Sequence, residues 1–218
     1  FMTQKLFWQD PYLTECTSKV TSIDGNKVKL DQTIFYAFSG GQQSDEGTIN
    51  DIKVINAVKE GDKENIIDIE YELETEPDFK VDDEVKIIID GKLRLDLMKL
   101  HAAAHIIYYF IKQELGNVKI VGSNVAGDKA RIDIGTADPL TEFVPKLEKI
   151  TNEFIAQGHD IKRYEDENNP DLRWWKLNEW KMPCGGTHVK NTKEIGLLKL
   201  SRKNKGKGKE RIEITLTH

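Results

Sequence analysis

The 218-residue chain contains 38% hydrophobic and 32% charged residues, and its formal net charge is −5. This balance is typical of a soluble globular protein, and apolar runs such as residues 106–110 are far too short to span a membrane. With only Cys16 and Cys184, the chain has too few cysteines for a disulfide framework, and a thiolate remains available as a metal ligand. The first residues lack the pattern of a signal peptide, so we expect a cytoplasmic protein.

The charge is distributed unevenly along the chain. Residues 1–90 carry 9 Lys and no Arg against 20 Asp or Glu, a balance of −11, whereas residues 91–218 carry 23 basic and 17 acidic residues, a balance of +6. A polyanionic partner would therefore be attracted to the second part of the chain. The change also predicts a boundary near Gly91, with one domain at 1–90 and another at 91–218.

The first domain shows the pattern of a small β protein. Runs of alternating or β-branched residues predict strands at residues 5–8, 12–23, 27–30, 48–58, 66–71 and 85–89. Asp24-Gly25-Asn26 and Glu60-Gly61-Asp62 are typical hairpin turns. We expect an antiparallel β-barrel of about six strands.

The second domain mixes helices and strands, which predicts the α+β class with helices packed on an antiparallel sheet. Apolar residues at helical spacing predict one helix at 92–114, ended by Gly116, and another from Pro139 to Gly158. Strands are expected at 118–125, 129–134, 160–164, 196–201 and 210–216. Pro170-Asp171 is expected to start a short helix that carries Trp174 and Trp175.

Two pairs of side chains predict a metal site. His101 and His105 are four residues apart on the first predicted helix, so both imidazoles lie on one face. Cys184 and His188 complete a set of three His and one Cys, which suits tetrahedral Zn²⁺. Residues 102–104 are alanines, which excludes an HExxH peptidase because that class needs Glu after the first His. The ligand set leaves open whether the zinc is structural or catalytic. His159 and His218 are expected at the surface.

Two further segments have an ordinary and a functional interpretation. Residues 35–47 contain Ser39-Gly40-Gly41-Gln42, which is either a wide turn or a loop where backbone approaches a ligand closely. Residues 201–211 carry six basic side chains, among them Lys205, Lys207, Lys209 and Arg211. This basic segment is either a solvated hairpin loop or a clamp for phosphates that its glycines keep mobile.

These motifs resemble a known family. The pair His101 and His105, the stretch 184–189 with 194–196 after it, Gly122-Ser123, and Lys207-Gly208-Lys209 before 211–213 are similar to the editing domain of alanyl-tRNA synthetase and its free-standing AlaX-type relatives. Residues 35–47 are similar to the glycine-rich motif of the synthetase and of the larger AlaX proteins. The resemblance covers nearly the whole chain.

The resemblance implies a hydrolase that acts in trans on mischarged tRNA(Ala), removing Ser or Gly while sparing Ala. His101, His105, Cys184 and His188 would be the zinc ligands and form the catalytic site. Ser39, Gly40, Gly41 and Gln42 would form a loop that closes on the acceptor end of tRNA, in place of an ordinary turn. Lys205, Lys207, Lys209 and Arg211 would lie near the acceptor-stem backbone.

Three positions depart from the family pattern and bear on which amino acid is removed. Ala102 stands where many members have Thr or Ser, Ile120 where some have Gln, and Phe38 where the synthetase commonly has Glu. Two alternatives remain. One is editing of Ser-tRNA(Thr), because the threonyl-tRNA synthetase editing domain shares the two-pair zinc layout, and the other is a non-catalytic tRNA-binding module with a structural zinc.

Overall fold

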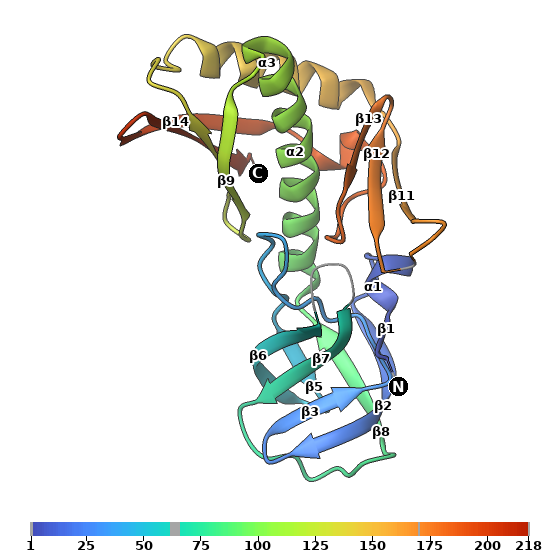
Figure 1. The fold of residues 1–218 in the computed structure, drawn as a ribbon. Helices are drawn as coiled ribbons and strands as arrows, with labels where there is room; N and C mark the ends of the chain where they lie inside the picture. Colours follow the sequence, from blue (N-terminus) through green and yellow to red (C-terminus); the bar gives the residue numbers. More distant parts are fainter. Residues whose placement is uncertain (1, 62–65, 170, 218) are drawn as a thin grey trace. The chain divides into compact units, whose positions relative to one another are not determined.

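The structure is a computed structural model that describes residues 2–61, 66–169 and 171–217 (Figure 1). The chain divides into two compact units, neither of which is a single stretch of sequence. Unit 1 consists of Phe1–Leu95, Glu165–Arg173 and Cys184–Thr187; unit 2 consists of Asp96–Tyr164, Trp174–Pro183 and His188–His218. The predicted domain ranges 1–90 and 91–218 stay a prediction. No helix in the described part of the chain is long and apolar enough to cross a membrane.

Unit 1 is built mainly from short antiparallel strands. Its elements are β1 (Gln4–Lys5), α1 (Leu6–Gln9), β2 (Glu15–Asp24), β3 (Lys27–Leu30), β4 (Gln32–Thr33), β5 (Gly47–Ile49), β6 (Ile52–Gly61), β7 (Ile66–Leu73) and β8 (Glu84–Ile89). Six of them pair in the closed order β2-β3-β7-β6-β5-β8, which forms a closed barrel. Alternation buries one face of each strand, as at Val85, Ile87 and Ile89 of β8. β1 and β4 form a separate parallel pair.

Two strand predictions in unit 1 were wrong in detail. Residues 48–58 are not one strand, because Asn50 and Asp51 adopt positive φ angles of 47° and 64° and form the turn between β5 and β6. Residues 5–8 are not a strand either, since Leu6–Gln9 forms the short helix α1. The turn predicted around Gly25 is confirmed, with φ 59° at the glycine. The predictions that fall on Asp62, Pro170 and His218 lie outside the described residues.

Unit 2 contains two helices and two antiparallel sheets. The elements are α2 (Gly91–Leu115, in unit 2 from Asp96 on), β9 (Lys119–Val125), β10 (Ala130–Gly135), α3 (Phe143–Gln157), β11 (Ile161–Glu165), β12 (Arg173–Leu177), β13 (Trp180–Pro183), the 3-10 helix η1 (Thr192–Ile195), β14 (Leu198–Gly206) and β15 (Lys209–Leu216). One sheet has the order β14-β15-β10-β9, the other β11-β12-β13. The α+β class with antiparallel sheets is confirmed.

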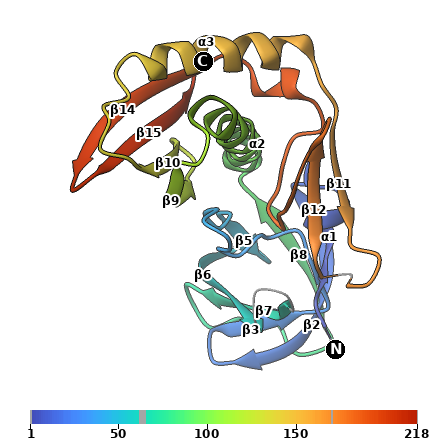
Figure 2. The ribbon, with the colours of Figure 1, turned by 45° about the horizontal axis from the view of Figure 1, so that its top comes forward.

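Packing in unit 2 places each helix against a sheet. α3 lies along β14 in both ribbon views (Figure 1, Figure 2), where the Asn152 amide exchanges hydrogen bonds with the backbone of Leu198. α2 packs on β12 and β13, with the Tyr109 ring stacked on Trp180 at 5.0 Å and its hydroxyl donating to the Lys181 carbonyl. These contacts hold α2 against the three-stranded sheet.

Two helix predictions in unit 2 need correction. α3 begins at Phe143 rather than at Pro139, because Pro145 clashes with the carbonyl four residues before it and is tolerated only in a first turn. Trp174 and Trp175 lie on a strand, β12, which pairs with β13 across a tight turn where Asn178 has φ 50°. The helix at 92–114 is confirmed by α2, and Gly116 ends it with φ 66°.

Candidate metal centre

The first two candidate ligands are placed by α2. The spacing of His101 and His105 brings their rings to 4.6 Å between centroids on the same helix face. The three alanines between them are buried, so this part of the helix packs closely and holds both rings at the border of the core. Trp175 is completely buried and its ring lies 4.9 Å from that of His105. The tryptophan therefore restricts the orientation of the second imidazole.

The other two candidates lie on the loop that follows β13. The Cys184 N–H donates to the Arg173 carbonyl at 2.8 Å, which extends the pairing of β12 and β13 by one residue. The indole N–H of Trp8 donates to the Gly185 carbonyl at 2.8 Å, and a Cβ on Gly185 would lie 3.7 Å from the same indole. The hydrogen bond therefore holds the loop on Trp8, whose indole is at ordinary van der Waals distance from position 185.

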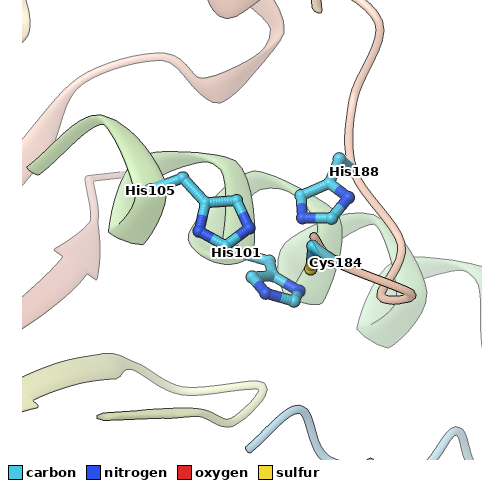
Figure 3. A group of neighbouring side chains, drawn as sticks. All are labelled: His101, His105, Cys184 and His188. Atoms are coloured by element: carbon cyan, nitrogen blue, oxygen red, sulfur yellow. The ribbon is translucent and has the colours of Figure 1, made fainter. Parts of the chain in front are cut away.

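The structure brings the four predicted ligands together. One nitrogen or sulfur atom from each of His101, His105, Cys184 and His188 lies within 4.8 Å of the others, and Figure 3 shows the side chains turned toward one another. The ring of His188 is 4.2 Å from that of His101 and 4.9 Å from that of His105. A tetrahedral ion with bonds of about 2.0–2.3 Å holds its donors about 3.3–3.8 Å apart, so the four donors are gathered to near the spacing of a single metal site.

The electrostatics of the cluster suit a cation. Burial lowers the pKa of His101 to about 4, and burial with the nearby His101 ring lowers the pKa of His105 well below its usual range. Burial of the Cys184 sulfur raises the pKa of the thiol to about 11. The two rings are therefore neutral near pH 7 and offer lone pairs, whereas the thiol needs a nearby cation to lose its proton.

The donor set fits zinc better than a hard cation. Nitrogen and sulfur ligands suit Zn²⁺, whereas Mg²⁺ and Ca²⁺ require oxygen ligands. The Nε2 atom of His105 is inaccessible to solvent and has no hydrogen-bond partner among residues 2–61, 66–169 and 171–217. A buried ring nitrogen is costly without a partner, and a metal ion would satisfy it.

The glycine-rich segment is held by hydrogen bonds at both ends. The N–H of Tyr36 donates to the Asp45 carboxylate and the N–H of Asp45 donates to the Tyr36 carbonyl, which closes the base of residues 37–44. Ser39 and Gln42 bridge the tip, where Gly40 and Gly41 have φ angles of 57° and 86°. Glycine adopts such angles at no steric cost, so it is favoured at both positions of the turn.

Gln42 is placed differently from Ser39, Gly40 and Gly41. Its side chain is completely buried, its amide nitrogen donates to the Thr187 hydroxyl at 2.9 Å, and its carbonyl oxygen accepts the Thr187 N–H at 3.0 Å. Both ends of the amide are thus used by the residue next to His188. This contact ties the glycine-rich segment to the loop 184–187.

Replacing Gln42 with Ala should lower the free energy of unfolding by about 1–3 kcal/mol, because two buried polar groups of Thr187 lose their partner. Urea denaturation of the variant beside wild type measures this loss. Gln43→Ala is the matched control, since Gln43 is only half-buried. Equal stability of the two variants would show that the bidentate contact contributes nothing.

The basic segment forms the end of a hairpin. β14 and β15 pair as far as Gly206 and Lys209, and Gly206, Lys207 and Gly208 make the turn with φ angles of 70°, 52° and 70°. The predicted hairpin loop is confirmed, and the glycines serve its tight turn; the phosphate-clamp alternative stays a prediction. Arg211 forms an ion pair with Asp133, its Nε donating at 2.6 Å. Lys205, Lys207 and Lys209 are exposed.

Three residues of the site region were not found from sequence. Arg94, at a position of the apolar stripe of α2, is buried and forms an ion pair with Asp45. A charged residue within an apolar stripe could have signalled this role. The sequence around Trp8 and Trp175 gave no such signal. The role of Trp8 depends on its contact with the loop at Gly185, and that of Trp175 depends on which face of β12 is turned toward His105. His159, expected at the surface, is half-buried and stacks on Phe154 at 4.2 Å.

Known protein families match two separate parts of the chain, and known proteins match nearly all of it. The family described as "Threonyl and Alanyl tRNA synthetase second additional domain" matches residues 166–213, and the family "tRNA synthetases class II (A)" matches residues 8–93. An alanyl-tRNA editing protein AlaX-M of Pyrococcus horikoshii is 37% identical over 99% of this chain and 98% of its own length. One from Methanosarcina mazei is 33% identical over 99% of this chain and 97% of its own length. An alanine–tRNA ligase of Sulfurisphaera tokodaii is 34% identical over 91% of this chain but 24% of its own length.

Proposed function

Because this chain belongs to the AlaX-M family of alanyl-tRNA editing proteins, we propose that it hydrolyses tRNA(Ala) that carries Ser or Gly and spares Ala-tRNA(Ala). In this reaction water adds to the ester carbonyl carbon, the bond to the terminal ribose oxygen breaks, and free amino acid and tRNA are released. The observation that carries the proposal is the four-donor cluster of His101, His105, Cys184 and His188. The cytoplasmic location expected from the sequence is part of the same proposal.

The domains and site residues have defined roles in this proposal. Residues 1–90 form a β-barrel domain with the glycine-rich motif, and residues 91–218 form the zinc-binding editing domain. Ser39, Gly40, Gly41 and Gln42 line the space that receives the acceptor end of the tRNA. Lys205, Lys207, Lys209 and Arg211 contact the acceptor stem. Arg211 contributes while paired with Asp133, which orients its guanidinium.

The cluster residues hold the metal and shape the site around the ester. Zinc, when bound, supplies Lewis acidity for activating water or for anchoring the substrate amino group. The Gln42 amide holds Thr187, so it fixes the backbone next to His188. No Asp or Glu stands within residues 101–105 or 184–188, so these two stretches supply no carboxylate base, and a bound zinc would supply the acidity that eases loss of the water proton, with the neighbouring ribose hydroxyl as the alternative proton relay.

Ala102 is the residue that bears most on the choice of amino acid. It lies between the two histidine ligands and is completely buried. Its methyl group cannot donate a hydrogen bond, so a substrate hydroxyl gains nothing from this position. Position 102 therefore offers no contact that would favour Ser over Gly. Hydrolysis of both Ser-tRNA(Ala) and Gly-tRNA(Ala) is therefore part of the proposal.

Two other functions give different results in one experiment. Editing of Ser-tRNA(Thr) is favoured by the family match at residues 166–213, which covers threonyl and alanyl enzymes alike. The third possible function, after editing of tRNA(Ala) and of Ser-tRNA(Thr), is non-catalytic tRNA binding by a module with structural zinc.

Release of labelled amino acid from Ser-, Gly- and Ala-tRNA(Ala) and from Ser-tRNA(Thr) tests all three. We expect turnover of Ser-tRNA(Ala) and Gly-tRNA(Ala) and background release from the other two. Turnover of Ser-tRNA(Thr) alone would favour the second function, and tRNA binding without any release would favour the third.

A further inference from the structure

The three-stranded sheet of β11, β12 and β13 has two faces of different chemistry. Its inner face carries Trp175 and Leu177, both completely buried, and Trp180, whose ring stacks on Tyr109 of α2. Strand alternation places the neighbouring residues on the opposite side. We call this side the outer face, and its members are Lys162, Tyr164, Trp174, Lys176, Lys181 and Pro183. All of them except half-buried Trp174 are exposed.

The outer face carries positive charge that the fold does not neutralise. None of its six positions is acidic, and among residues 2–61, 66–169 and 171–217 no ion pair involves Lys162, Lys176 or Lys181. In the β14–β15 hairpin of the same unit, by contrast, three cations are paired with carboxylates: Arg202 with Glu210, Lys203 with Glu213 and Arg211 with Asp133. The lysines of the outer face are therefore available to an anionic partner.

The pairing of β12 with β13 places two of these lysines against each other. Lys176 lies directly opposite Lys181 in the antiparallel register. Like charges directly opposite each other destabilise a sheet, so this pair does not serve folding. A local arrangement that works against stability is typical of a functional surface.

Two aromatic rings position one of the cations. The Lys181 ammonium lies 4.1 Å from the centre of the Trp174 ring and 5.5 Å from that of Tyr164. Such contacts orient a cation without cancelling its charge, as a carboxylate would. Adjacent strands are about 4.8 Å apart, so the side chains of Lys176 and Lys181 start from neighbouring positions on one face.

We propose that the outer face binds the phosphate backbone of tRNA, as a contact surface in addition to the basic segment around Lys207. The inference rests on the proposed function for its choice of polyanion. Lysines provide the sequence-independent part of nucleic-acid affinity, because each phosphate contact releases a counterion. The four-donor cluster lies next to Trp175, on the inner side of the sheet. The outer face would therefore hold the body of the tRNA and not its acceptor end.

A charge-removal variant tests this surface directly. Lys162→Gln/Lys176→Gln/Lys181→Gln keeps the side-chain stems and removes the three charges. The control, Lys146→Gln/Lys149→Gln/Lys199→Gln, changes the net charge equally at exposed lysines that pair with Glu114, Glu153 and Glu148. Binding of uncharged tRNA(Ala) is measured from about 50 to 200 mM salt, where phosphate contacts dominate affinity.

We expect weaker tRNA binding only for the outer-face variant, with the slope of log Kd against log salt reduced by about 2–3. Equal loss in both variants would overturn the proposal, because net charge alone would explain it, and so would unchanged binding of the outer-face variant. Lys176→Glu guards against a folding artefact. It should keep the thermal midpoint at or above that of wild type, since it replaces a repulsive pair with an attractive one, yet bind tRNA more weakly.

Deacylation separates this proposal from the proposed function. At saturating enzyme in a single turnover, the outer-face variant should release Ser from Ser-tRNA(Ala) at the wild-type rate. If wild type releases no amino acid but the variant loses tRNA affinity, the proposed function fails and the binding surface stands. If wild type deacylates and the variant binds tRNA normally, the surface proposal fails.

Discussion

Cys184→Ala should lose bound zinc and reduce Ser-tRNA(Ala) deacylation by more than about 100-fold, because even outer-shell changes at metal sites cost about 10–100-fold. The sulfur is one of four donors within 4.8 Å of one another, and burial raises the pKa of its thiol to about 11. The three histidines left in the variant would be the remaining candidate ligands, and none of them supplies an anionic atom to offset the charge of the ion. Metal content by mass spectrometry and release of labelled Ser are the two measurements.

Cys16→Ala is the matched control, since Cys16 lies on β2 and outside the cluster. It should retain both metal and activity. Cobalt substitution adds a readout that does not depend on catalysis, because wild type should show a thiolate-to-cobalt absorption band that Cys184→Ala lacks. Normal deacylation by a metal-free Cys184→Ala protein would contradict the catalytic role of the site.

The four-donor cluster was predictable from sequence because its signal is local. The i, i+4 spacing on a predicted helix places His101 and His105 on one face. Cys184 and His188 lie together in one short loop, and few other His or Cys residues in the chain could complete the set. The stripe of α2 was equally clear, since it persists from Leu93 to Leu115. Local periodicity therefore predicted the helix and two of the candidate ligands together.

The features that sequence reasoning missed depend on strand pairing or on contacts with residues distant in the chain. Trp174 and Trp175 follow a proline and suggest a helix, yet pairing with β13 makes them a strand with opposite faces. Gln42 looks like a loop residue, and only the contact with Thr187, 145 residues away, explains its burial. Tertiary contacts of this kind override local propensity, which no single-sequence pattern can anticipate.

Arg94→Ala should lower the free energy of unfolding by about 3–5 kcal/mol, the cost of leaving a buried charge without its partner. The guanidinium donates from Nε to the Asp45 carboxylate at 2.9 Å, from Nη1 to the Pro11 carbonyl at 2.9 Å and from Nη2 to the Ile34 carbonyl at 2.6 Å. Arg94 and Asp45 are both essentially excluded from solvent. Removing the arginine therefore strands a carboxylate and two carbonyl oxygens in the interior of unit 1.

Urea denaturation compares this variant with Lys92→Ala, which removes a cation from an exposed position in the same turn of α2. The control should lose less than about 1 kcal/mol, as exposed charges do. Arg94→Lys should fall between the two, because an ammonium keeps the charge but cannot reproduce the fork of the guanidinium. Asp45 also accepts the Tyr36 N–H at the base of the glycine-rich segment, so Arg94→Ala should make residues 37–44 more susceptible to limited proteolysis. A stability of Arg94→Ala equal to that of Lys92→Ala would show that the buried pair contributes no more than a surface charge.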